Sequence, residues 1–101
     1  MSDRPGMARI SSLALAEVAR VHDRSDAKHG GAYSWRRKKI PVLEYLSAAR
    51  RHEDAYLEGK QADPETRCHP LAHAIARLII LLDSELYGCL DDDRPPNGKE
   101  T

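Results

Sequence analysis

The chain has 101 residues, of which 41% are hydrophobic and 32% charged, so we expect one soluble globular domain with a modest core. Sixteen basic and sixteen acidic residues give a formal net charge of zero, which makes general nucleic-acid binding an unfavoured function. The longest apolar run, residues 78–82, is far shorter than a membrane span of about 20 residues. The N-terminus lacks the apolar stretch of a signal peptide, and the two cysteines form no paired framework, which favours a cytoplasmic protein.

The first predicted element is a helix that follows a flexible tail, residues 1–10. Ser11 or Ser12 can cap this helix, which should run to about Asp23. Apolar residues at helical spacing form one stripe: Ile10, Leu13, Ala14, Val18 and Val21. Glu17 falls inside the stripe, so its carboxylate needs a basic partner, a metal ion or an edge of solvent.

Residues 26–40 are predicted to be a loop rich in glycine, aromatic and basic residues. Gly30 and Gly31 break any helix, and residues 36–39 are four consecutive cations. Trp35 among cations suits a nucleotide, because an aromatic face stacks on a base and cations bind phosphate. The alternative is a basic surface loop that Trp35 anchors to the core.

A second helix should begin at Pro41, run to about Glu58 and stop at Gly59. Its inward stripe consists of Tyr45, Ala48, Ala49, His52 and Tyr56. His52 therefore points inward, either as a core group with a hydrogen-bond partner or as a ligand or catalytic group. Arg51 lies on a neighbouring face.

The linker and the third helix carry the other polar residues of interest. Asp63 precedes a proline and suits the cap of a short turn. Pro70 begins a helix with His69 near its cap, and Gly88 ends it. His69 and His73 are four residues apart and share one face. The helix is apolar almost all round, through Leu71, Ala74, Ile75, Leu78, Ile79, Ile80, Leu81 and Leu82.

These elements predict an all-α fold, a small helical bundle of three main helices plus short turns. A helix that is apolar on several sides needs cover that three short helices do not supply, so we expect oligomerisation to complete the bundle, as a homodimer or homotetramer. The helical domain should span residues 11–88, and residues 89–101 should form a disordered acidic tail.

Short motifs along the chain occur in a recognisable order: Lys28-His29-Gly30, Trp35-Arg36, Ala48-Ala49-Arg50-Arg51-His52, Gly59, Asp63, Glu65, His69 and Leu71-Ala72-His73-Ala74. In this order they resemble the phage dATP/dGTP diphosphohydrolase family of the MazZ type, a branch related to the MazG-like all-α nucleotide pyrophosphohydrolases. The resemblance covers about residues 13–82. The chain departs from the family pattern at His29, Ser34 and Lys60, where the family usually has Tyr, Asn and Glu.

The resemblance implies hydrolysis of a purine deoxynucleoside triphosphate, dGTP or dATP, to the monophosphate and pyrophosphate. It also implies Mg²⁺ or Mn²⁺ as cofactor, active sites between helices or subunits, and the cytoplasm of a phage-infected bacterium as location. No membrane partner is expected. The rival hypotheses are a non-catalytic helical protein that docks another protein or nucleic acid, and an enzyme of the same fold with another nucleotide substrate.

The expected site residues follow from the chemistry of the side chains together with what the family resemblance implies. Magnesium needs oxygen ligands, and manganese also accepts imidazole. A histidine can orient water when neutral and bind phosphate when protonated. The expected catalytic residues are His52, His73 and Arg51, the substrate-binding residues are Lys28, Trp35, Arg36 and His69, and the metal ligands are Glu17, Asp63 and His52. Of these, Lys28, Arg36 and Arg51 would hold phosphate oxygens, and Trp35 would stack on the purine.

Overall fold

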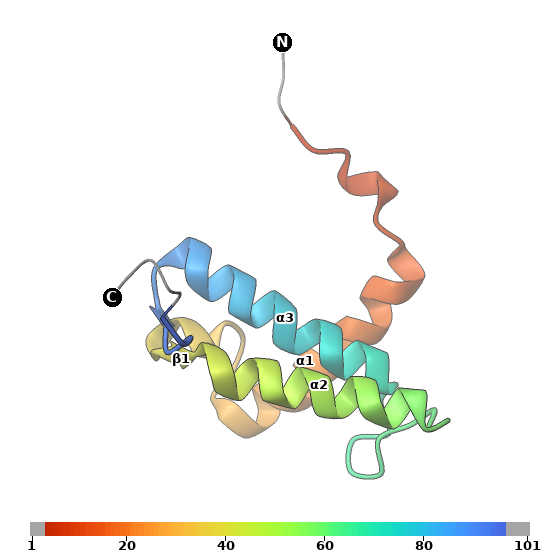
Figure 1. Ribbon diagram of the computed structural model, residues 1–101. Coiled ribbons are helices and arrows are strands. Elements are labelled where there is room, and N and C mark those ends of the chain that lie inside the picture. Colours follow the sequence, from red (N-terminus) through yellow and green to blue (C-terminus); the bar gives the residue numbers. More distant parts are fainter. Residues whose placement is uncertain (1–3, 97–101) are drawn as a thin grey trace.

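The structure is a computed structural model that describes residues 4–96. Within this range helices dominate, which confirms the predicted all-α fold (Figure 1). The helices are α1 (Ser12–His29), α2 (Val42–Leu57) and α3 (Pro70–Tyr87), and the short elements are the 3₁₀ turns η1 (Met7–Arg9) and η2 (Ser34–Arg37) and the strands β1 (Ile40–Pro41) and β2 (Leu90–Asp91). None of the helices in the described range is long and apolar enough to cross a membrane.

Helix α1 begins as predicted but ends later. The Ser11 hydroxyl accepts the backbone N–H of Ala14 at 3.2 Å, so Ser11 is the N-cap. The prediction ended the helix near Asp23, where the apolar stripe stops, yet the helix continues to His29. The residues after Asp23 stay helical up to Gly30, which ends the helix with a left-handed φ of 98°.

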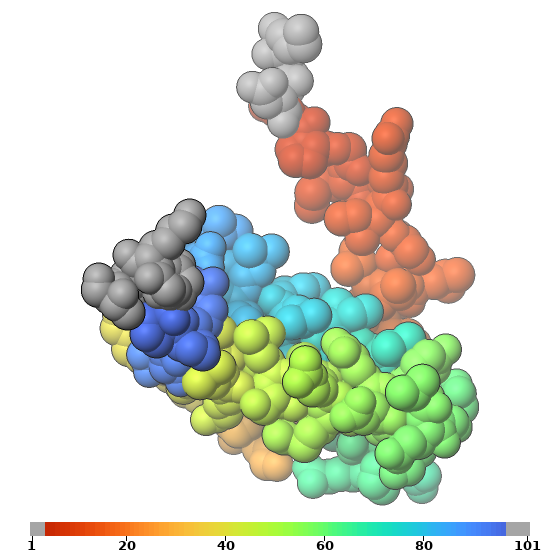
Figure 2. Space-filling view, in the orientation of Figure 1, coloured from red at the N-terminus to blue at the C-terminus, as the bar shows by residue number. Residues whose placement is uncertain are grey.

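Helix α3 is central, with α2 along one side and the C-terminal half of α1 against another (Figure 1). Val18 and Val21 of α1 form a buried cluster with Ala72 and Ala76 of α3 and with Cys68. The N-terminal half of α1 projects away from this body, as the space-filling view also shows (Figure 2), and Leu13 is 85% exposed there. The body therefore consists of α2, α3 and half of α1.

Residues 89–93, which were predicted to begin a disordered tail, make specific contacts with the rest of the chain. Cys89 is buried, and Leu90 pairs with Ile40 in a two-stranded parallel ladder. The carboxylate of Asp93 accepts the backbone N–H of Leu43 at 2.9 Å, at the start of α2. A strand of two residues carries no periodic signal in the sequence, so pattern analysis missed it. Residues 97–101 lie outside the described residues.

The same ladder changes the expected start of α2. Pro41 was predicted to be the first residue of the helix, but it lies in β1 and immediately precedes the helix. Behind the ladder, Ile40, Ile80 and Cys89 form a second buried cluster, and Trp35 packs against it. This cluster anchors η2 to the C-terminal half of α3. Residues 4–10, which precede α1, are exposed.

Candidate functional site

Two hollows in the described surface contain most of the predicted site residues. The histidine hollow has a volume of about 250 Å³ and is lined by Arg51, His52, Ala55, Lys60, Ala62, Asp63, Pro64 and Pro70. The aromatic hollow has a volume of about 380 Å³ and is lined by Ala19, His22, Asp23, Asp26, Ala32, Tyr33, Trp35, Arg36, Ile79 and Asp83. The structure thus separates the predicted residues into two groups.

In the linker, Asp63 organises a tight turn beside the histidine hollow. Its Oδ2 accepts the backbone N–H groups of Glu65 and Thr66, each at 3.0 Å. Burial by itself raises the pKa of Asp63, but these two hydrogen bonds and the nearby histidines outweigh it, so the pKa lies below its usual value. Asp63 therefore performs the capping role that its position before a proline suggested, and it stays ionised at neutral pH.

The imidazoles of His52 and His73 stack with ring centroids 4.5 Å apart. Nε2 of His73 shares a hydrogen bond of 2.6 Å with the Thr66 hydroxyl, which also donates to Asp63 Oδ2 at 3.4 Å. Burial lowers the pKa of both histidines; for His52, the neighbouring His73 lowers it further. At neutral pH both rings are therefore neutral. Of the two, it is His52 that lines the hollow, and its ring nitrogens accept or donate no hydrogen bond within residues 4–96.

Basic side chains lie near the stacked histidines and the Asp63 turn. Arg51 and Lys60 line the histidine hollow, and Lys60 lies 3.6 Å from Glu58 in an exposed ion pair that solvent screens. Lys28, at the end of α1, pairs with Glu65 of the linker at 3.4 Å. This contact brings the C-terminal end of α1, which borders the aromatic hollow, next to the turn that borders the histidine hollow.

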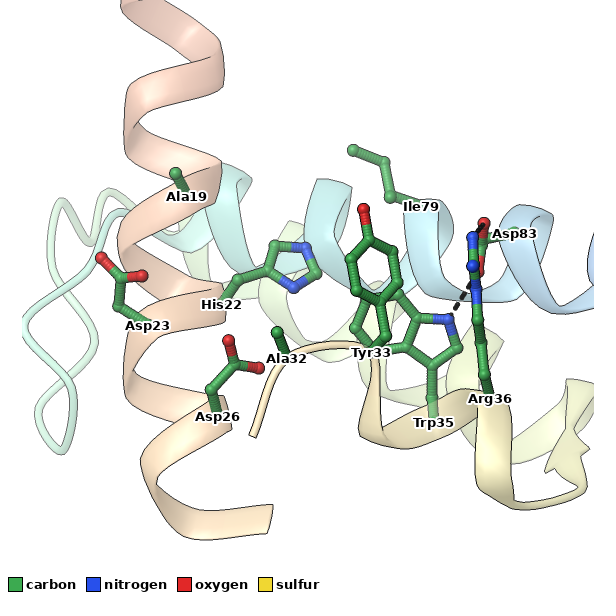
Figure 3. Close-up of a pocket in the computed structure, with 10 residues that line it drawn as sticks. All are labelled: Ala19, His22, Asp23, Asp26, Ala32, Tyr33, Trp35, Arg36, Ile79 and Asp83. Atoms are coloured by element: carbon green, nitrogen blue, oxygen red, sulfur yellow. Dashed lines mark hydrogen bonds and ion pairs between the residues drawn. The ribbon is translucent and has the colours of Figure 1, made fainter. Parts of the chain in front are cut away.

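In the aromatic hollow, the carboxylate of Asp83, which was not among the predicted site residues, binds both Trp35 and Arg36. The carboxylate of Asp83 in α3 accepts a hydrogen bond from the indole N–H of Trp35 at 2.7 Å (Figure 3). It also accepts two hydrogen bonds from Arg36, one from Nε at 2.9 Å and one from a terminal guanidinium nitrogen at 2.7 Å. The hydrogen bond from Arg36 lowers the pKa of Asp83, and the same bond raises the pKa of Arg36. The Arg36 guanidinium also lies over the rings of Tyr33 and Tyr87, at 4.4 and 4.5 Å.

These contacts define what Trp35 and Arg36 do in this chain. The guanidinium of Arg36 donates two hydrogen bonds to Asp83, and Arg36 does not line the histidine hollow. The centroid of the Trp35 ring lies 5.6 Å from that of His22 and 5.2 Å from that of Tyr33. Its edge is fixed by Asp83, which supports the alternative in which Trp35 anchors the loop, while its ring still lines the hollow.

His22 and Asp26 also line the aromatic hollow, and sequence analysis did not select them. They are four residues apart on α1, so they share a helix face, and this spacing was the available signal. The prediction overlooked it because it ended the helix at Asp23. Asp83 has a similar signal, since it follows Ile79 by four residues on α3 and therefore shares a helix face with it.

Like Lys28 and His73, the predicted site residues Glu17 and His69 line neither hollow and have structural partners. The Glu17 carboxylate accepts Arg20 Nε at 3.1 Å, one turn away on α1, which is the basic pairing considered as an alternative. Nδ1 of His69 accepts the backbone N–H of Leu71 at 3.0 Å and caps α3, with its ring 5.3 Å from that of Tyr56. The structure does not bring Glu17 to Asp63 or His52, and among residues 4–96 no three His, Cys, Asp or Glu side chains are placed to hold a metal ion.

Comparison with known protein families finds a match over most of the chain. The model of the family described as dATP/dGTP diphosphohydrolase, N-terminal, matches residues 1–94. No curated protein and no solved structure matches the chain. The family match covers all three helices, both hollows and the turn that carries Asp63. By this match the chain belongs to the dATP/dGTP diphosphohydrolase family, and residues 1–94 correspond to the N-terminal domain of that family.

Proposed function

We propose that this chain hydrolyses purine deoxynucleoside triphosphates, dGTP and dATP, to the monophosphate and pyrophosphate. The family description, which names both nucleotides, supports the substrate class. The observation that carries the proposal is the position of His52, a neutral imidazole that faces a hollow bordered by the cations Arg51 and Lys60. Hydrolysis of a phosphoanhydride needs this combination of a proton acceptor and positive charge.

Each side chain of the histidine hollow then has a role. Arg51 and Lys60 bind phosphate oxygens and offset the negative charge that develops on the triphosphate. His52 accepts a proton from the attacking water, because its ring is neutral at neutral pH and its nitrogens have no partner within the described residues. His73 positions His52 by stacking, and Thr66 and Asp63 hold His73 in place.

Magnesium or manganese enters the proposal as the ion that accompanies the triphosphate substrate. Proteins usually bind Mg²⁺ through one or two carboxylates together with substrate phosphates. In the histidine hollow Asp63 supplies a carboxylate, but its Oδ2 already accepts backbone N–H groups. Within the described range one chain does not assemble a metal site of three protein ligands, so the roles above use the chain's own side chains alone.

We further propose that the working unit is a homodimer or homotetramer. Five large apolar side chains at helical spacing on α3 are between 37% and 77% exposed: Ile75, Leu78, Ile79, Leu82 and Leu86. Burying such a stripe stabilises an assembly by roughly 25 cal/mol for each Å² removed from water. The projecting half of α1, where Leu13 is 85% exposed, offers an apolar surface of the same chain to a second copy.

The activity is tested by incubating the protein with each of the four deoxynucleoside triphosphates, with Mg²⁺ or with Mn²⁺, and separating the products by chromatography. The proposal expects dGMP or dAMP together with pyrophosphate. If the folded protein turns over none of the triphosphates, the hydrolase proposal fails. Release of orthophosphate in place of pyrophosphate would also contradict it, because the bond cleaved would be a different one.

The role of His52 is tested by His52→Gln, which keeps a polar side chain of similar length but cannot accept the proton efficiently. We expect kcat to fall by about 10²–10⁴-fold. His29→Gln is the matched control, since His29 is exposed and lines neither hollow. Equal activity of the two variants would remove His52 from the mechanism.

A non-catalytic helical interaction protein is the second candidate, and specific observations favour it. Glu17, Asp63 and His69, three of the predicted site residues, each have a structural partner of their own. In this candidate the exposed cations Lys38 and Lys39 and the apolar stripe of α3 bind another macromolecule. The product assay separates the two candidates, because only the enzyme converts triphosphate.

A further inference from the structure

We propose that the aromatic hollow is a purine-base pocket in which Asp26 selects guanine over adenine. The inference deepens the proposed function and rests on it for the nature of the substrate. It assigns a side chain to base selection, which the family description, naming both dATP and dGTP, leaves open.

The hollow has the size and lining of a small-molecule site. Its volume of about 380 Å³ falls within the roughly 300–1,000 Å³ of known ligand pockets. The rings of His22, Tyr33 and Trp35 border one continuous space between α1 and α3 (Figure 3). Aromatic faces of this kind stack on bases. Because Asp83 holds the Trp35 edge at 2.7 Å, the ring is already in place and its ordering costs little on binding.

The charges around the hollow favour a base over a phosphate. The cation Arg36 is paired with Asp83, and Lys28 is paired with Glu65. Asp26 is half-buried, and its carboxylate accepts no hydrogen bond and forms no ion pair within residues 4–96. Figure 3 shows this carboxylate beside Ala32, across the hollow from the Arg36–Asp83 pair. An unpaired carboxylate repels phosphate and attracts a ligand that offers hydrogen-bond donors.

The shape of a carboxylate discriminates between the two purines. An ionised carboxylate is an acceptor only, with two oxygens side by side. Guanine presents two adjacent donors on its Watson–Crick edge, N1–H and the N2 amino group, so both oxygens of Asp26 are satisfied. Adenine presents the N6 amino donor beside the N1 lone pair, which leaves one oxygen facing another acceptor. A site built around paired donors rejects an analogue that lacks one, because a polar group stays unpaired.

Trp35 is the single tryptophan of the chain, so fluorescence excited selectively at tryptophan, rather than at the four tyrosines, reports on this hollow. The full chain is titrated with dGMP and with dAMP up to about 10 mM, a range that covers millimolar dissociation constants. Free tryptophan amide corrects for absorption by the nucleotides. We expect a saturable change at a dGMP concentration about tenfold or more below that for dAMP.

The decisive variant is Asp26→Asn. The asparagine amide presents one donor and one acceptor, which pairs with N6 and N1 of adenine and equally with N1–H and O6 of guanine, so the preference for dGMP should be lost. Asp54→Asn, on the exposed side of α2, is the matched control and should keep the preference for dGMP. Circular dichroism confirms that both variants keep their helices.

The outcomes separate this inference from the hydrolase proposal. If neither nucleotide changes Trp35 fluorescence, or if Asp26→Asn keeps the original preference, the base pocket is overturned even when the triphosphates are hydrolysed. If dGMP binds with the Asp26-dependent preference while no triphosphate is hydrolysed, the pocket stands and the catalytic proposal fails. Equal binding of both nucleotides to the unmodified chain would remove the selective role of Asp26.

Discussion

His52 of α2 and His73 of α3 stack with their ring planes 14° apart and their centroids 4.5 Å apart, which joins the two main helices through a pair of neutral imidazoles. The arrangement disfavours charge on the rings, because burial penalises the imidazolium form and two imidazolium ions at this separation repel each other. The pair therefore links the stability of the bundle to pH and also positions the proposed catalytic base.

The first prediction concerns this pH dependence. The pKa of each histidine is lower in the folded chain than in the unfolded one, so the unfolded chain binds more protons as the pH falls below about 6.5. The contribution of the pair to stability is therefore complete above that pH and is lost as the pH falls through the lowered pKa values. Urea unfolding at pH 7.5 and at pH 5.5 measures the loss, before Asp63, with its own lowered pKa, is protonated.

The double variant His52→Gln, His73→Gln provides the comparison for this experiment. It should lose much of the stability difference between the two pH values. An unchanged difference would assign the pH dependence to other groups. His29→Gln, an exposed position, controls for the loss of a histidine as such.

A second prediction concerns Thr66, whose hydroxyl connects His73 to Asp63. Thr66→Val keeps the shape of the side chain and removes the hydroxyl, so we expect a loss of about 1 kcal/mol in the free energy of unfolding. We also expect an NMR titration to show a changed pKa for His73. Thr66→Ser restores the hydroxyl and should recover both properties, and a serine variant that behaves like valine would contradict the hydrogen-bond role.

A third prediction concerns the carboxylate that joins α3 to η2. Asp83→Asn replaces the ion pair with Arg36 by neutral contacts and weakens the acceptor for the Trp35 N–H. The expected loss is about 1–3 kcal/mol in the free energy of unfolding, with a change in Trp35 fluorescence. Glu85→Gln, two residues along on the exposed surface of α3, should change neither quantity. If Asp83→Asn matches this control, Asp83 does not hold η2 in place.

A fourth prediction tests the assembly. Leu82→Glu places a charge in the middle of the exposed stripe of α3 and should shift the protein toward monomer in light scattering, because a charge is costly to bury. Leu57→Glu introduces the same charge at a side chain that is 84% exposed outside that stripe, and should leave the mass unchanged. A monomeric unmodified chain would rule out the proposed oligomer directly.

Local signals in the sequence were sufficient for several parts of the fold. Ser11 caps α1, His69 caps α3, and Gly88 ends α3 with a left-handed φ of 96°. Such features depend on residues within one turn of each other, so their chemistry can be deduced without the tertiary structure. The order of short motifs likewise indicated the family that the match over residues 1–94 establishes.

Contacts between distant residues could not be deduced in this way. Nothing in the local sequence pairs Trp35 and Arg36 with Asp83, nearly fifty positions later, or Leu43 with Asp93. For the same reason Arg36 was expected to bind phosphate, whereas the fold gives it a carboxylate partner. A side chain's charge is visible in the sequence, but its partner depends on which elements pack together.

The sequence by itself determined the helical class, the caps, the family and the concentration of histidines around α2 and α3. Only the tertiary structure decided how those polar residues are divided: Glu17 and His69 have local partners, Asp63 caps its turn, and His52 faces a hollow with cations. The physical reason is that the spacing of residues along a helix sets which face a side chain occupies, whereas burial, stacking and the hydrogen bonds that govern a pKa arise when helices meet.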